Sequence, residues 1–417
     1  MDIEYIKSNT VWDIEKKSLN QVKLCREEFR KRIISDKAYW EILWYKSSYK
    51  AESVIFEQNK ILGDSFVYER NLRYPNIESY YSKMFMVPSG LRSKALLYNS
   101  GIAAIVNSIR TYIDGYSRKK INILCSKGYF ETFYYISDLS NVEVTELENY
   151  DPYTAYDILI VEPVLYSESM RSIDYMKMLE VFISNGLSTK IKMIIVDCTL
   201  VTHLKLEMDR LYGFVMENKD TILIIAESLL KLHQLGLEIS SAGLAQIMFS
   251  ENSKLTKDMD MFLWKCEKNR ELFSVNLSLN NLRGISHPFM YNTEILRIYS
   301  TAIFNNNAWV AQRLNSQKFK VFHPFLDCVN YLWSVSPIII IKFMEDKKER
   351  YVEALNFIEA KAHEMRVKFY NGSSFGFFES RYEIINYSQE RNEWFLKLAI
   401  GFDNKDLDKI VSIINDL

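Results

Sequence analysis

A lysine stands just beyond a buried apolar segment in the middle of the chain. Lys231 lies in SLLKLHQLG, shortly after the run TILIIA, and Asp197 ends an earlier run, MIIVD. A lysine amine held away from water loses its proton more easily and then offers nitrogen as a nucleophile. Taken alone, a lysine in such a position is more often a solvated loop residue. The neighbouring motifs therefore have to decide between the two interpretations.

A second stretch, NSGIAAIVNSI at 99–109, opens an apolar helical pattern with Ser100 and Gly101. The first N–H groups of a helix are unpaired, and they lie at the positive end of the helix dipole, so they favour an anion such as phosphate. Many helices begin with serine and glycine for capping alone. By itself this motif is a weak signal.

Four features that could each bind part of one cofactor follow one another along the chain. A phosphate-type helix start, the aromatic cluster GYFETFYY at 128–135, Asp197 and Lys231 appear in that order. Pyridoxal 5′-phosphate requires backbone donors for its phosphate, an aromatic face for its ring, a carboxylate for its pyridine nitrogen and a lysine amine for its aldehyde. The ordered set favours a pyridoxal phosphate site.

The order and approximate spacing of these motifs resemble the cystathionine γ-synthase and β-lyase type of pyridoxal phosphate enzymes of Cys/Met metabolism, within fold type I. The resemblance runs from about residue 61 to the C-terminus and marks a divergent member. It implies an α/β fold with a mostly parallel central sheet between helices and a smaller C-terminal α+β domain. It also implies a homodimer or homotetramer with a shared active site.

The resemblance assigns roles residue by residue. Lys231 would form the Schiff base, Asp197 would contact the pyridine nitrogen, and Tyr129 would stack on the ring and move a proton. VYERNLRYP, at 67–75, is similar to a segment in which Tyr68 and Arg70 reach the cofactor phosphate of a neighbouring subunit. The implied cofactor-binding set is Ser100, Gly101, Ile102, Tyr129, Asp197, Thr199, Ser228, Lys231, Tyr68 and Arg70, and the implied catalytic residues are Lys231 and Tyr129.

The chain departs from the family pattern mainly where a substrate would bind. Leu230 stands in place of the threonine before the lysine, and Cys198 in place of an asparagine. The usual carboxylate-binding arginine is Lys397, which binds as a point charge, whereas Arg381 could supply the planar fork. SSFGFFES, at 373–380, resembles a family segment and places Ser374 near the substrate carboxylate. The substrate-binding candidates are therefore Ser374, Arg381 and Lys397.

The resemblance implies an enzyme that acts on an amino acid through an external aldimine and a quinonoid. The expected outcome is a lyase or transferase reaction, either β- or γ-elimination of a C–S or C–O group or γ-replacement. Two alternatives remain open at this point. One is an aminotransferase on the same fold, and the other is a catalytically inactive binding subunit that retains the fold.

Composition sets outer limits on these interpretations. The chain has 417 residues and a formal net charge of −1, which gives no reason to expect nucleic acid or an anionic membrane as a partner. The five cysteines are scattered, which is typical of reduced thiols and a cytoplasmic setting. No HExxH or clustered metal-ligand spacing occurs, so no metal site is expected. No apolar run is long enough to span a bilayer.

Four short apolar runs predict strands of a sheet that is covered on both faces, because none of them alternates with polar residues. They are INILC (121–125), YDILIVEP (156–163), KMIIVD (192–197) and TILIIA (221–226). We expect a helical arm over 1–60, a large cofactor-binding α/β domain over 61–290 and a small α+β domain over 291–417. Ligands of such sheets bind at the carboxyl ends of the strands.

Overall fold

The structure is a computed structural model, and it describes residues 16–35, 69–115, 120–167, 169–327, 331–388 and 393–417. Within the predicted arm, 17–33 belongs to a helix, α2 (Lys16–Ser35). The rest of the predicted arm, 1–15 and 36–60, lies outside the described residues, as does Tyr68. Among the described helices, none is both long enough and apolar enough to cross a membrane.

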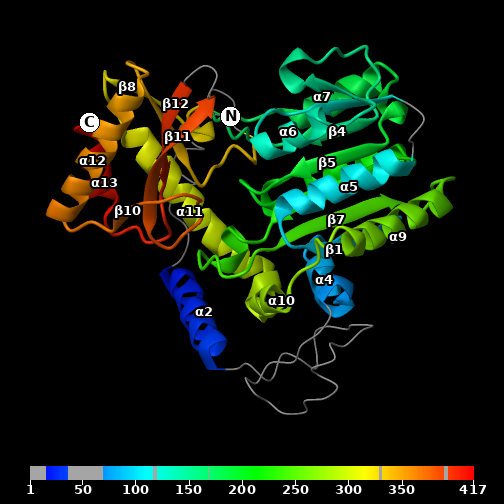
Figure 1. Cartoon of the computed structure of the whole chain (residues 1–417), viewed down its shortest axis with the longest axis horizontal. Helices are drawn as coiled ribbons and strands as arrows, with labels where there is room; N and C mark the ends of the chain where they lie inside the picture. Colours follow the sequence, from blue (N-terminus) through cyan, green and yellow to red (C-terminus); the bar gives the residue numbers. More distant parts are fainter. Residues whose placement is uncertain (1–15, 36–68, 116–119, 168, 328–330, 389–392) are drawn as a thin grey trace.

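A seven-stranded sheet forms the centre of the larger part of the molecule (Figure 1). Its strand order is β1-β7-β6-β5-β4-β2-β3, and the four predicted apolar runs supply four of its five inner strands, β2, β4, β5 and β6. The strands are β1 (Leu91–Tyr98), β7 (Gly243–Ser250), β6 (Ile222–Ser228), β5 (Met193–Asp197), β4 (Ile158–Val161), β2 (Ile121–Cys125) and β3 (Val142–Glu146).

The direction of the strands brings distant segments to one edge of this sheet. Strands β6, β5, β4, β2 and β3 are parallel, so their carboxyl ends lie on the same edge. β7 is antiparallel to β6, and β1 is antiparallel to β7, so β1 runs in the same direction as the parallel strands. The predicted, mostly parallel sheet is confirmed. Residues that follow β1, β2, β4, β5 and β6 are therefore neighbours in space.

Helices cover both faces of the sheet, which explains why its inner strands are apolar throughout. Figure 1 shows α5 (Gly101–Gly115) and α9 (Thr256–Leu272) across one face, where they pack with α6 (Phe130–Ser137). The opposite face packs against α4 (Pro75–Lys83), α7 (Tyr175–Ser184) and α8 (Met208–Glu217). Two buried apolar clusters result, one on each side of the strands.

A second sheet of five strands forms the C-terminal part, in the order β10-β11-β12-β9-β8. Helices α12 (Lys348–Glu364) and α13 (Leu407–Asn415) share a buried apolar cluster with it. Its strands are β8 (Phe319–Phe322), β9 (Ile339–Phe343), β10 (Phe369–Asn371), β11 (Ser380–Ser388) and β12 (Glu393–Ala399). The smaller second α+β unit is confirmed, whereas the division at 290/291 remains a proposal.

The long helix α11 (Thr293–Arg313) begins close to that proposed division, and its start follows from local capping. Asn292 precedes it, and its side-chain oxygen accepts hydrogen bonds from the N–H groups of Glu294 and Ile295. Helix α2 packs against α11, and the Arg26 Nε donates to the carbonyl oxygen of Leu235 at 3.2 Å. The N-terminal helix thus contacts the loop that follows Lys231.

A buried ion pair joins α9, α4 and β1 at the edge of the large sheet that β1 forms. Arg270 of α9 donates to the Glu78 carboxylate of α4 at 2.5 Å and to the carbonyl oxygen of Leu97 in β1 at 2.9 Å. The Leu97 N–H donates to the same carboxylate at 3.1 Å. Both charged side chains are nearly inaccessible to water, so each depends on the other for its compensation.

We expect Arg270→Met to lower the free energy of unfolding by about 3 kcal/mol, because it leaves the Glu78 carboxylate buried without its cation. Urea unfolding followed by circular dichroism measures the change. The matched control is Arg110→Met, which breaks the exposed pair between Arg110 and Asp114 and should cost less than about 1 kcal/mol. Equal effects in the two variants would contradict the assignment of Arg270 to a structural pair.

Candidate active site

A cavity of about 400 Å³ opens at the carboxyl edge of the large sheet and reaches the second sheet. A cavity of this size accommodates a cofactor or a small substrate. The structure brings most of the predicted site residues to it, from segments that are far apart in sequence. The predicted residues that line the cavity are Ser100, Gly101, Ile102, Tyr129, Asp197, Thr199, Ser228, Lys231, Ser374 and Lys397.

Lys231 lies in the connection between β6 and β7, and its side chain is only 20% exposed. Its Nζ donates to the Ser374 hydroxyl at 2.5 Å and forms an ion pair with Glu238 at 3.3 Å. Ser374 in turn donates to Glu238. Phe375 lies beneath the amine, with its ring centre 5.5 Å from Nζ. The amine is therefore held in the cavity wall, and it is not a solvated loop residue.

Asp197 ends β5, the strand beside β6, and a hydrogen-bond network fixes its carboxylate. The Thr199 N–H donates to Oδ1 at 3.0 Å, and the Thr199 hydroxyl accepts from the N–H of Ser228 at 3.0 Å. Burial raises the pKa of Asp197 above its ordinary value, although Thr199 counteracts this. Among the described residues, no lysine, arginine or histidine forms an ion pair with Asp197. The site thus offers a buried carboxylate to a donor that is not part of the described chain.

The start of α5 faces the end of β6 closely enough to form a small cradle. A Cβ on Gly101 would lie 3.2 Å from the backbone and side chain of Ser228, so glycine permits this approach. The Ser100 hydroxyl accepts from the N–H of Ala103, and this bond caps the helix. The N–H groups of Gly101 and Ile102 have no acceptor within the helix. They provide the donors that a phosphate group prefers.

The aromatic segment after β2 forms the next part of the wall. Tyr129 and Phe130 both line the cavity. Phe133 instead packs in the apolar cluster on the α5 and α9 face of the sheet, and its ring lies under Lys127. The Tyr129 N–H donates to Oε1 of Glu162 at 2.7 Å. A Cβ on Gly128 would lie only 2.0 Å from the Glu162 carboxylate, so that glycine makes room for it. Glu162 follows β4 and anchors the aromatic segment to the sheet.

Electrostatics at this wall favour protonated groups. Burial, together with the negative charge of Asp197, raises the pKa of Glu162 to about 8, although the N–H groups of Tyr129 and Tyr166 partly offset the shift. Burial and a hydrogen bond with Glu131 raise the pKa of Tyr129 well above its ordinary value. Both groups therefore carry their protons at neutral pH.

The second sheet closes the far side of the cavity with a buried ion pair. Lys397 of β12 and Glu383 of β11 are cross-strand neighbours, and Nζ contacts the carboxylate directly. Burial lowers the pKa of Lys397, whereas Glu383 raises it in part. Both residues line the cavity. The predicted carboxylate-binding cation thus already has an anionic partner.

The structure does not bring two predicted residues into the cavity. Arg381 precedes the pair on β11, but its guanidinium lies over the Phe377 ring at 3.4 Å and donates to the carbonyl oxygen of Ser373. Arg70 is exposed, and its Nε donates to the carbonyl oxygen of Glu271 at 3.0 Å. Arg70 is accessible on the surface, and its predicted contact with the cofactor phosphate of a neighbouring subunit stays a prediction. Tyr68 lies outside the described residues.

Three acidic residues of the site were not assigned to it from the sequence. Glu162 carries a signal that could have been used, because it follows an apolar run directly, as Asp197 does. Glu238 and Glu383 carry no such signal. They meet Lys231 and Lys397 only through loop geometry and cross-strand register.

Solved structures share this architecture. The chain resembles a methionine gamma lyase from Micromonospora echinospora at 13% identity, with 86% of this chain and 89% of that chain covered and a TM-score of 0.57. It also resembles a protein described as an aromatic amino acid beta-eliminating lyase/threonine aldolase from Exiguobacterium sp. 255-15, at 10% identity, 98% and 96% coverage and a TM-score of 0.50. A sphingosine-1-phosphate lyase from Burkholderia pseudomallei matches at 8% identity, 82% and 75% coverage and a TM-score of 0.50.

No protein-family model matches the sequence, and no curated protein matches it. At 8–13% identity the structural likenesses concern the fold. That fold is the fold type I architecture of pyridoxal phosphate-dependent enzymes, with its large, mostly parallel sheet and smaller second sheet.

Glu162→Gln should flatten the pH dependence of stability between about pH 5 and about pH 8. In the unfolded chain the Glu162 carboxyl ionises near its ordinary pKa, but in the folded chain it keeps its proton up to about pH 8. The folded state then binds more protons, so its stability falls as the pH rises through this window. The amide oxygen of glutamine can still accept from the Tyr129 N–H, which limits other effects.

Urea unfolding of both proteins across the window measures this difference. We expect the wild type to lose at least about 1 kcal/mol more than Glu162→Gln as the pH rises. Glu143→Gln is the control, since Glu143 forms an exposed pair with Lys120. Parallel stability curves for wild type and Glu162→Gln would show that the buried carboxyl is already ionised.

Proposed function

We propose that the chain is a pyridoxal phosphate-dependent enzyme that acts on an amino acid by β- or γ-elimination or by γ-replacement. The observation that carries the proposal is the assembly of Lys231, Asp197, Ser228 and the start of α5 around one cavity. These groups come from two neighbouring strand ends, those of β5 and β6, and from one helix start. Their order in the sequence supports the same cofactor independently.

The residues present fit the cofactor at each of its contact points. Gly101, Ile102 and Ser228 would hold the phosphate, Asp197 would face the pyridine nitrogen, and Lys231 Nζ would hold the aldehyde carbon. The buried Asp197 carboxylate shows the best match to the cofactor, because a pyridinium N–H would offset the cost of removing this carboxylate from water. Within the part of the chain that the structure describes, no arginine lines the cavity, so Arg70 of a neighbouring subunit is the proposed additional partner of the phosphate.

When bound, the cofactor draws electrons away from the substrate Cα. The chain's own residues then handle position and protons. Asp197 would face the ring nitrogen, and its carboxylate would favour the protonated form of that nitrogen. Lys231 Nζ, once free, is placed to accept the Cα proton, because Ser374 and Glu238 already hold that amine in the cavity. The Tyr129 hydroxyl, which is protonated at neutral pH, is placed to donate a proton to the departing side-chain group.

The substrate-facing side differs from the cofactor-facing side in its charge balance. Lys397 is the buried cation nearest to the family's carboxylate-binding position, and Glu383 already neutralises it. A substrate carboxylate would therefore compete with Glu383 for Lys397. This competition supports a specialised amino-acid substrate, and the likeness to a methionine gamma lyase supports elimination as the first reaction to test.

Lys231→Ala should abolish a yellow chromophore that the purified, cofactor-loaded wild type shows. Borohydride reduction of the wild type should fix the cofactor covalently to the peptide that contains Lys231, as measured by mass spectrometry. We expect a loss of elimination activity of at least about 1000-fold in Lys231→Ala, because the same amine holds the cofactor and moves the proton.

Lys177→Ala provides the control, since Lys177 is an exposed lysine of α7 and should leave both signals intact. A colourless wild type that takes up no added cofactor would support a binding subunit and refute the proposal. Release of a keto acid and ammonia would identify elimination, whereas accumulation of a pyridoxamine form would identify transamination.

Lys397→Met should raise KM for the amino-acid substrate by about tenfold and change kcat less, because it removes the buried cation that receives the carboxylate. Steady-state kinetics of wild type and variant measure the two constants, and near-UV circular dichroism checks the fold. Arg381→Met is the comparison, since Arg381 lies outside the cavity. A larger KM effect in Arg381→Met would transfer the carboxylate-binding role to Arg381.

A further inference from the structure

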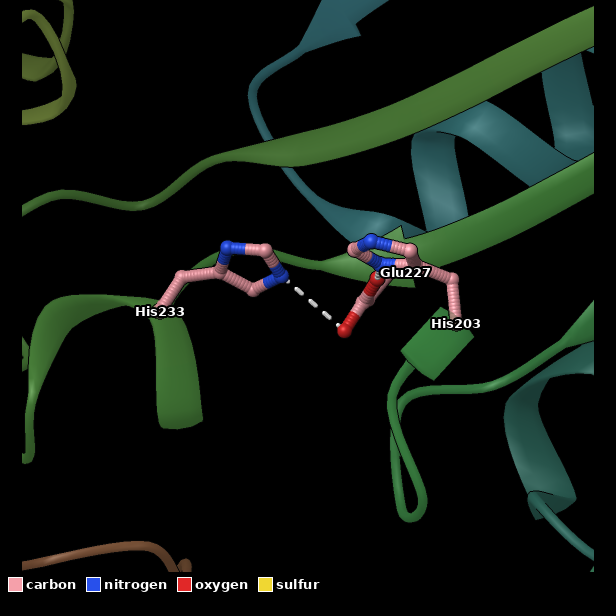
Figure 2. Close-up of side chains that lie close together, drawn as sticks. All are labelled: His203, Glu227 and His233. Carbon is pink, nitrogen blue, oxygen red and sulfur yellow. Dashed lines mark hydrogen bonds and ion pairs between the residues drawn. The ribbon is translucent and has the colours of Figure 1, made fainter. Parts of the chain in front are cut away.

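Three polar side chains form a buried cluster at the carboxyl end of β6 (Figure 2). They are His203 of η4 (His203–Lys205), Glu227 of β6 and His233 of η5 (Leu232–Gln234). Side chains alternate along a strand, so Glu227 points away from the cavity that Ser228 lines. None of the three is more than 3% exposed. Phe85 belongs to the apolar cluster on the α4, α7 and α8 face of the sheet, and its ring centre lies 4.4 Å from that of His203.

Glu227 lies between the two rings, and each imidazole approaches a different carboxylate oxygen (Figure 2). His203 Nδ1 is 3.0 Å from Oε2, and His233 Nε2 is 3.0 Å from Oε1. The three ligand atoms lie within 4.8 Å of one another. Two imidazole nitrogens and one carboxylate are a donor set that binds Zn²⁺ with one position left open.

His233 has an oxygen atom near each of its two ring nitrogens. The Glu227 carboxylate approaches Nε2, and the carbonyl oxygen of Met290 lies 3.4 Å from Nδ1. Nε2 makes no aligned hydrogen bond within the described residues. A metal ion at Nε2 would leave Nδ1 to donate to Met290, as metal-bound histidines commonly arrange it.

The two imidazole nitrogens indicate which class of ion fits. Imidazole nitrogen favours zinc-like ions over magnesium or calcium, which prefer oxygen ligands. Cys198 is fully buried near Glu227, but its thiol donates to the carbonyl oxygen of Ala226 at 3.4 Å.

We infer that His203, Glu227 and His233 bind a divalent transition-metal ion of the zinc class. The ion joins the connection after β5, the end of β6 and the loop after Lys231, so it fixes the far side of the strand ends that carry Asp197 and Ser228. Its role is structural, because His203, Glu227 and His233 do not line the cavity. The inference does not depend on the proposed cofactor.

The test uses the full chain, treated with a chelator, dialysed against Zn²⁺ and analysed for bound zinc by mass spectrometry. We expect one equivalent of zinc per chain and a rise in Tm that the chelator reverses. Co²⁺ in place of Zn²⁺ should give the visible absorption bands of a four-coordinate site. His203→Gln and Glu227→Gln should each weaken Zn²⁺ binding by at least about tenfold.

His363→Gln, which changes an exposed histidine of α12, is the control and should retain the full equivalent. The inference is overturned if the wild type retains no zinc and shows no change in Tm, because the cluster is then an imidazolium–carboxylate pair only. It is equally overturned if both ligand variants fold, as judged by near-UV circular dichroism, and still bind one equivalent. The wild-type measurement decides even if the variants fail to fold.

Discussion

A carboxylate buried at the end of β5 is the constraint on which the candidate site depends. Removing Asp197 from water is costly, and within the described residues only hydrogen bonds from Thr199, and no cation, lower that cost. The parallel strands keep Ser228 and Lys231 beside it, since residues after β5 and β6 reach the same edge. A positively charged ring inserted here would stabilise the protein and gain a fixed electrostatic environment at the same time. The negative charge of Asp197 would thus contribute both to binding the ring and to its reactivity.

The end of β6 presents side chains to both faces of the sheet, and each face belongs to a different proposed site. Ala226 and Ser228 face the cavity side, whereas Glu227 between them faces the far side, because side chains alternate. A slip of one residue in the β5–β6 register would exchange these faces. The cavity and the buried His203–Glu227–His233 cluster therefore depend on the same pairing of Asp197 with Ala226. This coupling explains how a metal ion on one face could stiffen the site on the other.

The sequence was sufficient to predict the central strands and the residues at their ends, but not the acidic residues that pair with Lys231 and Lys397. Continuous apolar runs identified β2, β4, β5 and β6 because burial on both faces removes all polar alternation. Asp197 and Lys231 were identifiable since polar residues after such runs must lie at the sheet edge. Glu238 and Glu383 were not, because their contacts arise from loop geometry and from pairing between β11 and β12. The cluster of His203, Glu227 and His233 was not predicted either, because loop geometry brings these residues together and their spacing in the sequence matches no metal-binding motif.

The acidic residues that the sequence did not assign decide which substrates the cavity can hold. Glu238 partners Lys231, and Glu383 partners Lys397, so both basic residues of the lining are already neutralised. A site built simply to attract amino-acid carboxylates would leave one cation unpaired. Under the proposed function, an incoming carboxylate would gain affinity only by displacing Glu383 from Lys397, and that exchange would be favourable only if Glu383 found a new donor on the substrate. The proposed function therefore leads us to expect an amino acid whose side chain carries a hydrogen-bond donor or a positive charge near its leaving group.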